Sequence, residues 1–569
     1  MDVMRPRSVR MDEPVSRLTR ANQPLAILKG TTFTARLEQI FHGELPIEPL
    51  EGSKCKRILI PGLTGGELHF SILGFIAQAL RIRGADVTAL MCDEVLPACT
   101  LRKADHVESA CTRWCHRNSP CFAEAMNLPH RWYSAFLSDK HKRDCQAFAA
   151  GWSLNDLPSL EYRGIALGEL VIVSLESYFK VGGVDWRKPE VTRKAHDFLL
   201  AALYLTEISL RALKELRINK VLLDDGKKTD WGVMRAAARH LGIPVDVINI
   251  GIRGTSVRFT LDRPGCSPAS MPGWDRWQHQ PLTAVEEEQL DAYLLRRECV
   301  PYEYSQEMWN TAPVSSAEAR QQLKLPAAID GKVFAMFPNL GFDAGKTRSG
   351  AIAFTSPAEW VIKTAEIFHD HPQHHLILKA HPAEHHRQAS DSILHILRDS
   401  VGVLPANIHL VEATSHLTAK SIVELADIVI VYTSTVAVEA AAIGKPVVLV
   451  GGGWNAGRGI ATDVTSPQQY FDLLEQIMAG RYTPPASETI GRRYAYSLFF
   501  RNDIPINHFC MEDFHISAIT IDSAAELCPG VDPSMDVICR GILFDEPFEN
   551  PETRRYDPMP VATELSHQL

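Results

Sequence analysis

Residues 426–450, ADIVIVYTSTVAVEAAAIGKPVVLV, decide the fold that this chain is expected to adopt. The apolar run at 428–431 predicts a buried strand, and a helix is expected from about Thr435 to Ile443. Gly444 ends that helix, and a second strand follows at 446–450. A strand, a helix and another strand in this order are typical of a parallel sheet with helices on its faces.

The same alternation recurs on both sides of this segment. We expect further strands near it at 333–337, 375–379 and 407–411, and a helix at 357–369. An earlier group of expected elements comprises strands at 56–60, 87–91, 220–223 and 245–250 and helices at 192–216 and 231–241. We therefore predict an α/β fold of two Rossmann-like lobes, whose parallel sheets face a central cleft where ligands bind.

The pattern suggests boundaries for these parts. The expected parts are an N-terminal arm (1–50), a first lobe (51–285) with a Cys-bearing insertion (92–145), a linker (286–330), a second lobe (331–482), a closing helix (483–515) and a C-terminal tail (516–569).

Composition excludes several classes of protein. The 59 basic and 68 acidic residues give a net charge of −9 and are spread along the chain, so no basic field is available to recruit nucleic acid. The longest apolar stretch, 198–205, is far shorter than the roughly 20 residues of a membrane span. The first twenty residues contain no apolar signal region. We expect a cytoplasmic protein with reduced thiols.

Thr433-Ser434-Thr435 opens the helix that follows the strand at 428–431. Hydroxyls and free backbone N–H groups at a helix start suit a phosphate, and Glu439, about one turn later, can accept hydrogen bonds from a sugar diol. The alternative is a capped helix with a solvated glutamate. Similarly, His381-Pro382 follows the strand that ends at Lys379, where the imidazole and the ammonium can stabilise a leaving phosphate. The alternative there is a structural turn.

At these residues the chain resembles the bacterial capsule and surface-polysaccharide glycosyltransferases of the GT-B architecture. In that family Lys-x-His-Pro precedes a Ser/Thr cluster, Glu-Ala and Gly-Lys-Pro; here these are Lys379-Ala380-His381-Pro382, Thr433-Ser434-Thr435, Glu439-Ala440 and Gly444-Lys445-Pro446. The glycine-rich stretch 451–459 with Asp463 is similar to that of Kdo-transferring capsule enzymes, and 493–500 is similar to their aromatic closing helix. The resemblance covers about residues 55–90, 215–260 and 333–505.

The resemblance implies a nucleotide-sugar donor in the second lobe and a polysaccharide or lipid-linked glycan acceptor. The implied donor residues are Lys379, His381, Pro382, Thr433, Ser434, Thr435, Glu439, Gly452 and Gly453. No metal or cofactor is required for the chemistry, because the helix dipole and side chains neutralise the leaving phosphate. Peripheral association with the inner face of the membrane is implied as well, since such glycans are often built on lipid carriers.

Asp224-Asp225-Gly226 follows a strand of the first lobe. Sialyl- and polysialyltransferases that use CMP-sugars carry an acidic-acidic-Gly motif before their His-Pro, and this resemblance makes Asp224 or Asp225 the general base, with His381 as the second catalytic group. The same resemblance favours a CMP-linked acidic sugar as the donor over a UDP- or GDP-sugar. Lys227-Lys228 departs from the pattern, because two cations would stabilise the carboxylates as ions and lower their basicity.

Two first-lobe segments are candidates for binding the acceptor. Thr64-Gly65-Gly66-Glu67 lacks the full Gly-x-Gly-x-x-Gly pattern, so it is either an acceptor loop or a plain turn, and NAD or FAD binding is disfavoured. Arg253 follows another strand and can contact an anionic acceptor or a donor phosphate.

The cysteines of the insertion contain no Cys-x-x-Cys pair. They can nevertheless assemble a structural zinc or iron–sulfur site, or they are small apolar thiols of the core. The candidates are Cys92, Cys99, Cys111, Cys115 and Cys121.

Three other functions fit the two-lobed pattern. They are a transferase of CDP-activated polyol phosphate of the teichoic-acid type, a UDP-sugar 2-epimerase, and a non-catalytic polysaccharide assembly factor on a degenerate transferase scaffold. The epimerase would need no acceptor, and the assembly factor would tolerate replacement of His381 and Asp225 by alanine.

Overall fold

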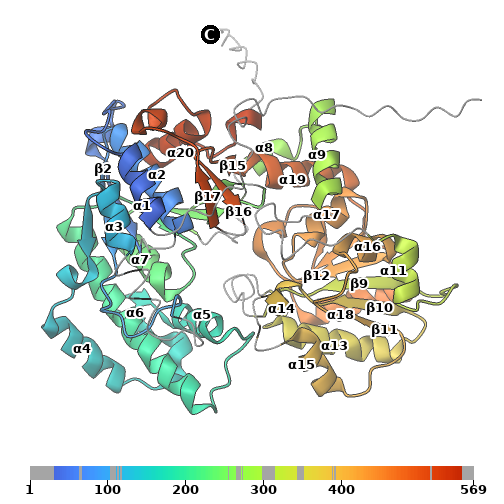
Figure 1. The fold of residues 1–569 in the computed structure, drawn as a ribbon. Coiled ribbons are helices and arrows are strands. Elements are labelled where there is room, and N and C mark those ends of the chain that lie inside the picture. The colour runs from blue at the N-terminus through green and yellow to red at the C-terminus, as the bar shows by residue number, and fades with distance from the viewer. Residues whose placement is uncertain are drawn as a thin grey trace, which may run out of the picture.

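The computed structural model describes residues 31–62, 67–102, 111, 115, 118–253, 255–263, 271, 273–297, 314–341, 352–386, 389, 392–512 and 515–553. These residues form two α/β lobes that lie side by side (Figure 1). Each lobe is built around one large sheet.

The sheet of the first lobe has the strand order β15-β8-β7-β6-β1-β2-β3. Its parallel strands are β1 (Arg57–Pro61), β2 (Asp86–Met91), β3 (His130–Trp132), β6 (Lys220–Asp224) and β7 (Val245–Ile250). Two antiparallel strands extend one edge, β8 (Ser256–Leu261) and β15 (Ile504–Pro505). The strand order reverses between β1 and β6, and ligands bind at such a switch point in doubly wound sheets.

Helices cover both faces of this sheet because successive side chains of a strand point to opposite sides. In β1, Ile58 and Ile60 join one apolar cluster and Leu59 joins the other. The first cluster includes side chains of α1 (Thr31–Ile40), α2 (Glu67–Ile82), α3 (Ser119–Ala125) and α20 (Pro533–Phe544). The second includes side chains of α4 (Asp139–Ala150), α5 (Gly168–Phe179), α6 (Pro189–Glu215) and α7 (Thr229–His240).

The sheet of the second lobe is wholly parallel, with the order β11-β10-β9-β12-β13-β14. Its strands are β9 (Val333–Phe337), β10 (His375–Lys379), β11 (Ile408–Val411), β12 (Ile428–Val431), β13 (Val447–Leu449) and β14 (Thr462–Asp463). One face packs on α13 (Pro357–Asp370), α15 (Ile393–Val401) and α18 (Pro467–Met478), and the other on α16 (Ala419–Leu425), α17 (Val436–Ala442) and α19 (Glu488–Tyr496).

Both sheets therefore have the doubly wound order of the Rossmann fold, with switch points between β1 and β6 and between β9 and β12. The predicted fold class, α/β with two Rossmann-like lobes, is confirmed.

The other elements are α8 (Trp274–Trp277), α9 (Ala284–Arg297), α11 (Ser316–Gln322), α14 (Ala383–His386), β4 (Glu161–Tyr162), β5 (Ile165–Ala166), β16 (Phe509–Glu512), β17 (His515–Ile519) and the short helices η1 (Ser53–Cys55), η3 (Tyr133–Phe136), η4 (Leu154–Ser159), η5 (Gly453–Asn455), η6 (Ser497–Arg501), η7 (Ala524–Leu527) and η8 (Pro551–Thr553).

Three segments differ from their sequence-based description. The expected arm contains α1, whose apolar side chains are buried in the first lobe, and the Cys-bearing insertion supplies strand β3 to the sheet edge. The expected tail returns to the first lobe, where Asp536 of α20 pairs with the fully buried Arg83. Figure 1 shows these C-terminal elements, drawn in red, beside the blue elements of the first lobe. They return because α2 has an apolar face that α20 covers.

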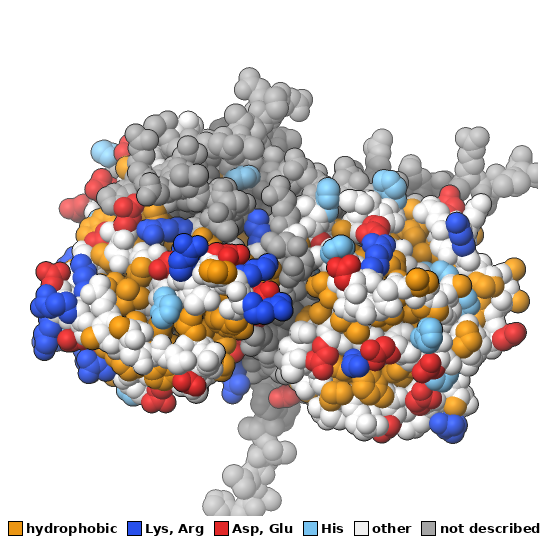
Figure 2. Space-filling model, turned by 90° about the horizontal axis from the view of Figure 1, so that it is seen from below, with side chains coloured by type: hydrophobic (Ala, Val, Ile, Leu, Met, Phe, Trp, Pro, Cys, Tyr) orange, Lys and Arg blue, Asp and Glu red, His pale blue; other side chains and the backbone are white. Residues whose placement is uncertain are grey.

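The described surface is mixed in charge. Figure 2 shows acidic and basic side chains interspersed on both lobes on the face seen from below. None of the helices in the described ranges combines the length and the apolar character needed to cross a bilayer.

Candidate functional site

Three strand ends lie level at the switch point of the second lobe. Leu378 of β10 pairs with Met336 of β9, and Phe337 of β9 pairs with Val431 of β12. His381 follows β10 and Ser434 follows β12, with β9 between them, so the loops that carry them start about 10 Å apart, two strand spacings, at the same edge of the sheet. The topology thus brings the predicted His-Pro and Ser/Thr segments to one place.

Lys379 is a buried cation at this edge. Its side chain forms no hydrogen bond or ion pair with the residues that the structure describes, and burial lowers the pKa of its ammonium to about 8. Thr433 is also buried, and its hydroxyl oxygen has no hydrogen-bond partner among the described atoms, while its backbone N–H donates to Asn339 Oδ1 at 3.0 Å. A buried hydroxyl without a partner is costly unless a ligand pairs with it, and a lysine side chain that is largely buried loses much of its hydration.

The imidazole of His381 is oriented by the turn that Pro382 opens. Its Nδ1 accepts a hydrogen bond from the backbone N–H of Ala383 at 3.1 Å. In the neutral ring the proton is then on Nε2, which makes Nε2 a donor. The side chain of His381 is half-buried.

Arg297, which the sequence analysis did not single out, engages two of the predicted donor residues. Its Nη2 donates to Thr435 Oγ1 at 3.1 Å, and its Nε donates to Glu439 Oε1 at 2.8 Å. Arg297 ends helix α9, and its guanidinium is buried over the ring of Phe499 at 4.9 Å from the centroid. The Glu439 carboxylate therefore has a protein cation as partner.

The glycine-rich loop after β13 is fastened to the Ser/Thr segment. Asn455 Nδ2 donates to the carbonyl oxygen of Ser434 at 2.9 Å, and the N–H of Gly451 donates to the carbonyl of Tyr432 at 3.0 Å. Gly453 has φ +76°, a left-handed conformation that favours glycine, and Gly452 precedes it at the start of η5. Ser434 Oγ accepts from the N–H of Val436 at 3.3 Å.

The switch point of the first lobe holds a pair that includes an unpredicted histidine. Nδ1 of His69 in α2 lies 2.8 Å from Asp224 Oδ2 at the end of β6. Burial disfavours the imidazolium, but the charge and hydrogen bond of Asp224 leave the pKa of His69 above its usual value. The other predicted carboxylate, Asp225, pairs with Lys227 at 2.7 Å and lies 3.9 Å from Lys228. The sequence signal that could have identified His69 is its place in the first helix after the first strand.

An indole N–H lies beside this pair. The ring centroids of Trp231 and His69 are 6.5 Å apart, and Trp231 Nε1 is buried without a hydrogen-bond partner among the described atoms. Gly62, with φ +66°, ends the strand here, and a Cβ built on it would lie only 2.6 Å from Trp231 Nε1.

The other candidate acceptor residues lie in two places. Thr64, Gly65 and Gly66 are outside the described residues, and Glu67 is the first residue of α2. The N–H of Arg253 donates to Asp503 Oδ2 at 2.8 Å, and its guanidinium lies over the ring of Phe500, 4.4 Å from the centroid. Arg253 is thus held by the segment that returns from the second lobe.

The two lobes touch on the loops that follow α5 and β9. A Cβ built on Gly182 would lie 3.2 Å from the Cα of Gly341, so the two backbones approach closely. Arg258 of β8 makes a second contact, because its guanidinium lies 5.1 Å from the ring centroid of Trp454 in η5.

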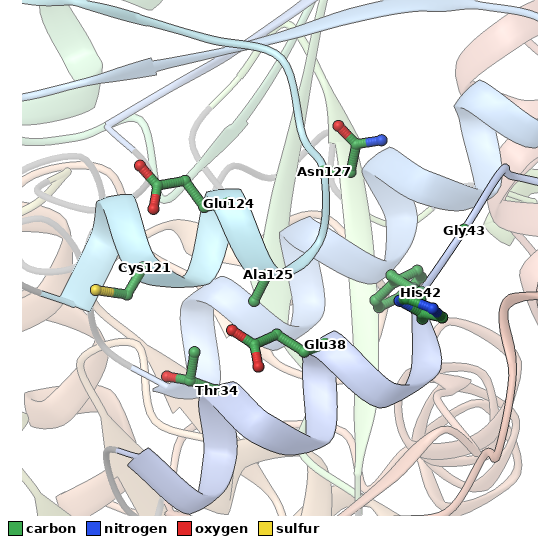
Figure 3. Close-up of a pocket in the computed structure, with 9 residues that line it drawn as sticks. Thr34, Glu38, His42, Gly43, Cys121, Glu124, Ala125 and Asn127 are labelled. Carbon is green, nitrogen blue, oxygen red and sulfur yellow. The ribbon is translucent and has the colours of Figure 1, made fainter.

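The cysteines of the insertion separate into two groups. Cys111 and Cys115 are buried and Cys92 and Cys99 are half-buried, and Cys111 Sγ accepts a hydrogen bond from Arg102 Nε at 2.8 Å. Cys121 is exposed on α3 and lies on a pocket of about 380 Å³ between α1 and α3, together with Glu38 and His42 (Figure 3).

Comparison with protein-family models and with curated protein sequences gives no match. Solved structures of similar fold include KpsC, beta Kdo 2,4 transferase, from Thermosulfurimonas dismutans (14% identity, 51% of this chain and 82% of that chain, TM-score 0.34). They also include a glycosyltransferase from Rickettsia africae (9%, 78% and 93%, 0.25) and UDP-GlcNAc 2-epimerase from Neisseria meningitidis bound to UDP-GlcNAc (11%, 77% and 97%, 0.22). The chain is similar to known Kdo transferases and other glycosyltransferases. The fold class itself rests on the two sheet orders.

Proposed function

We propose that this protein is a glycosyltransferase that moves a sugar from a nucleotide-sugar donor, with a CMP-linked acidic sugar favoured, to a surface polysaccharide or glycolipid acceptor. The observation that carries the proposal is the largely buried Lys379 side chain at the second switch point, whose ammonium has no partner among the described residues. The Thr433 hydroxyl at the same edge of the sheet has none among them either. An anionic phosphate would satisfy both groups at once. The sequence resemblance supports the choice of donor.

In this mechanism the second lobe stabilises the leaving group. Breaking the bond between sugar and phosphate leaves negative charge on the nucleotide phosphate. Lys379 supplies a positive charge, and the hydroxyls of Thr433 and Ser434 and the His381 imidazole supply hydrogen-bond donors. Donors already held in place for charge that develops in the transition state lower the barrier without reorganisation.

In the same mechanism the first lobe activates the acceptor. Asp224 accepts the Nδ1–H of His69, so that Nε2 of the ring can take the proton of the acceptor hydroxyl. The Asp224 carboxylate then stabilises the imidazolium that forms. Because Asp225 is engaged by two lysines, we assign the base to His69, with Asp224 as its orienting group.

The donor site is tested by a thermal-unfolding screen of the full chain with CMP, CDP, UDP and GDP. A nucleotide at 100 times its Kd should stabilise the fold by about 2.7 kcal/mol. We expect CMP to give the largest shift, and Lys379→Met and Thr433→Val to lose it. Lys363→Met, on the exposed side of α13, is the matched control and should keep it. If no nucleotide stabilises the wild-type chain, the proposal is wrong.

The reaction is tested by turnover of CMP-sugar with and without a glycan acceptor. His69→Gln should lower kcat about 10²- to 10⁴-fold and leave the Kd for CMP unchanged. His395→Gln, an exposed histidine of α15, is the control. Conversion of a UDP-sugar without an acceptor would instead indicate an epimerase, and transfer of a polyol phosphate from a CDP donor would indicate a teichoic-acid-type enzyme. If polysaccharide assembly survives His69→Gln and His381→Ala, the role is non-catalytic.

A further inference from the structure

The side chain of Thr435 is engaged from outside its own helix. Its hydroxyl caps none of the backbone N–H groups of α17, all of whose residues the structure describes. The hydroxyl accepts instead from Nη2 of Arg297 at 3.1 Å, and Oε1 of Glu439 accepts from Nε of the same guanidinium at 2.8 Å. One cation from α9 therefore holds both the residue before α17 and a residue in its first turn.

The guanidinium of Arg297 rests on aromatic rings. Its Nη1 donates to the hydroxyl of Tyr293 at 3.3 Å, and its central carbon lies 4.9 Å from the ring centroid of Phe499. The centroids of these two rings are 5.1 Å apart. Tyr293 belongs to α9 and Phe499 to η6, so two elements outside the second sheet fix the place of the cation. The side chain of Arg297 is only 3% exposed.

Helix α9 is in turn attached to α19. Arg492 of α19 donates to Glu287 at 2.6 Å and to Asp291 at 2.7 Å, and both carboxylates belong to α9. Because α19 packs closely against α17, Arg297 reaches α17 from a fixed direction. A buried Arg–Glu pair adds little net stability compared with apolar side chains of similar size, so its presence here points to a role in holding geometry.

The same pair sets the charge beside the Ser/Thr segment. Glu439 comes four residues after Thr435, which is about 6 Å along a helix. A carboxylate at that distance without a cation would repel a phosphate bound at the segment. Arg297 neutralises the carboxylate and fixes its orientation through Oε1, although the Glu439 side chain is still 27% exposed.

We propose that Arg297 is a positioning residue of the donor site, which holds the segment Thr433-Ser434-Thr435 in place for the nucleotide phosphate and keeps Glu439 as its counter-ion instead of as a ligand of the nucleotide's sugar diol. This inference rests on the proposed function and adds the residue that orders the phosphate-binding segment. Loss of the guanidinium frees the Thr435 hydroxyl and leaves the Glu439 charge unpaired, so phosphate binding weakens. Simultaneous loss of the Glu439 charge removes the repulsion.

The test is titration calorimetry of the full chain with the nucleotide that stabilises the wild type most, which we expect to be CMP. Arg297→Met should raise the Kd at least about tenfold, and Glu439→Gln added to it should return the Kd to within about threefold of wild type.

Arg501→Met is the matched control for this experiment. It breaks another buried pair between η6 and α9, in which Arg501 lies 2.6 Å from Glu286 and stacks over Trp277 and Tyr496. The Kd of this variant should equal that of wild type, while urea unfolding should show a loss of stability in both methionine variants. A purely structural role of Arg297 would destabilise the protein and leave the Kd of the folded variant unchanged.

A second ligand covers the case in which the Arg297 variants fail to fold. Glu439→Gln keeps the shape of the side chain, and its Kd is compared for the same nucleotide and for the 2′,3′-dideoxy form, which lacks both sugar hydroxyls. The ratio of these two Kd values should be the same in Glu439→Gln and in wild type.

Two results would overturn the role of Arg297. They are a ratio that falls toward one only in Glu439→Gln, which would show that Glu439 binds the diol, and a wild-type Kd in folded Arg297→Met. Both presuppose that the wild type binds a nucleotide, so they leave the proposed transferase function standing. Absence of any nucleotide binding by the wild type would instead contradict the proposed function and this role together.

Discussion

The pKa values of Lys379 and His69 are shifted in opposite directions by their surroundings. Lys379 has no described partner, and burial alone lowers the pKa of its ammonium to about 8. Burial also acts on His69, but Asp224 raises the pKa of His69 above its usual value, which makes the imidazole a stronger base. Unusual proton affinities at a switch point are typical of groups that bind or react with a ligand.

The lowered pKa of Lys379 predicts how nucleotide binding depends on pH. The ammonium is charged below pH 8, so the Kd should be flat there and rise about tenfold per pH unit above 8. An unfolded chain titrates this lysine near 10.4 and binds more protons between pH 8 and 10.4, so the contribution of Lys379 to the free energy of unfolding rises over that range. Titration calorimetry with CMP measures the Kd.

Lys379→Arg is the control for this prediction. Its guanidinium remains charged at high pH, so the Kd of this variant should stay flat up to pH 10. A wild-type Kd that is constant from pH 7 to 10 would show that Lys379 does not contact the nucleotide.

Helix α17 is positioned by close packing against α19. A Cβ built on Gly491 of α19 would lie 2.5 Å from both the carbonyl carbon and the carbonyl oxygen of Ala441 in α17. Thr435 lies just before α17 and Glu439 lies within it, and both accept a hydrogen bond from Arg297 of α9. The glycine therefore sets the distance between the closing helix and the helix that begins at the Ser/Thr segment.

Gly491→Ala should push α19 away from α17. Overpacking of this kind costs about 1–3 kcal/mol, and we expect that loss in the free energy of unfolding measured with urea, together with weaker CMP binding. Gly183→Ala is the matched change, because no described atom lies within 4 Å of a Cβ built there. Equal stability of the two variants would show that the helices tolerate a wider spacing.

The chain passes from the first lobe to the second and back, and Asp503 attaches the returning segment to the first lobe. Its carboxylate is fully buried and accepts hydrogen bonds from the N–H of Ile252 at 2.6 Å and from Arg258 Nε at 2.9 Å. Arg258 in turn lies over Trp454 of the second lobe. This cluster joins the returning segment, the first sheet and the loop that follows β13.

Asp503→Ala should destabilise the protein by about 3–5 kcal/mol, because it leaves the guanidinium of Arg258 buried and unpaired. Asp522→Ala removes an exposed pair with Arg36, whose atoms lie 2.7 Å apart, and should cost less than about 1 kcal/mol. Urea unfolding of both variants at pH 7 measures the difference. A loss below 1 kcal/mol in Asp503→Ala would show that water replaces the carboxylate.

The sequence alone determined four strands of the first sheet, five strands of the second, and the helices α6, α7, α13 and α17. Apolar runs such as 428–431 and stop signals such as Gly444 act over a few residues, so they can be read locally. The α/β class follows from their alternation. So does the expectation that the segments at His381 and Ser434 meet at one edge of a sheet.

Only the tertiary structure decided which side chains are partners. Arg297 and Glu439 are 142 residues apart, and His69 reaches Asp224 only because β1 and β6 are neighbours in the sheet. Likewise, residues 516–553 belong to the first lobe because α2 has an apolar face to cover. Such pairings depend on strand order and on which faces are buried, and no local pattern in the sequence encodes either one.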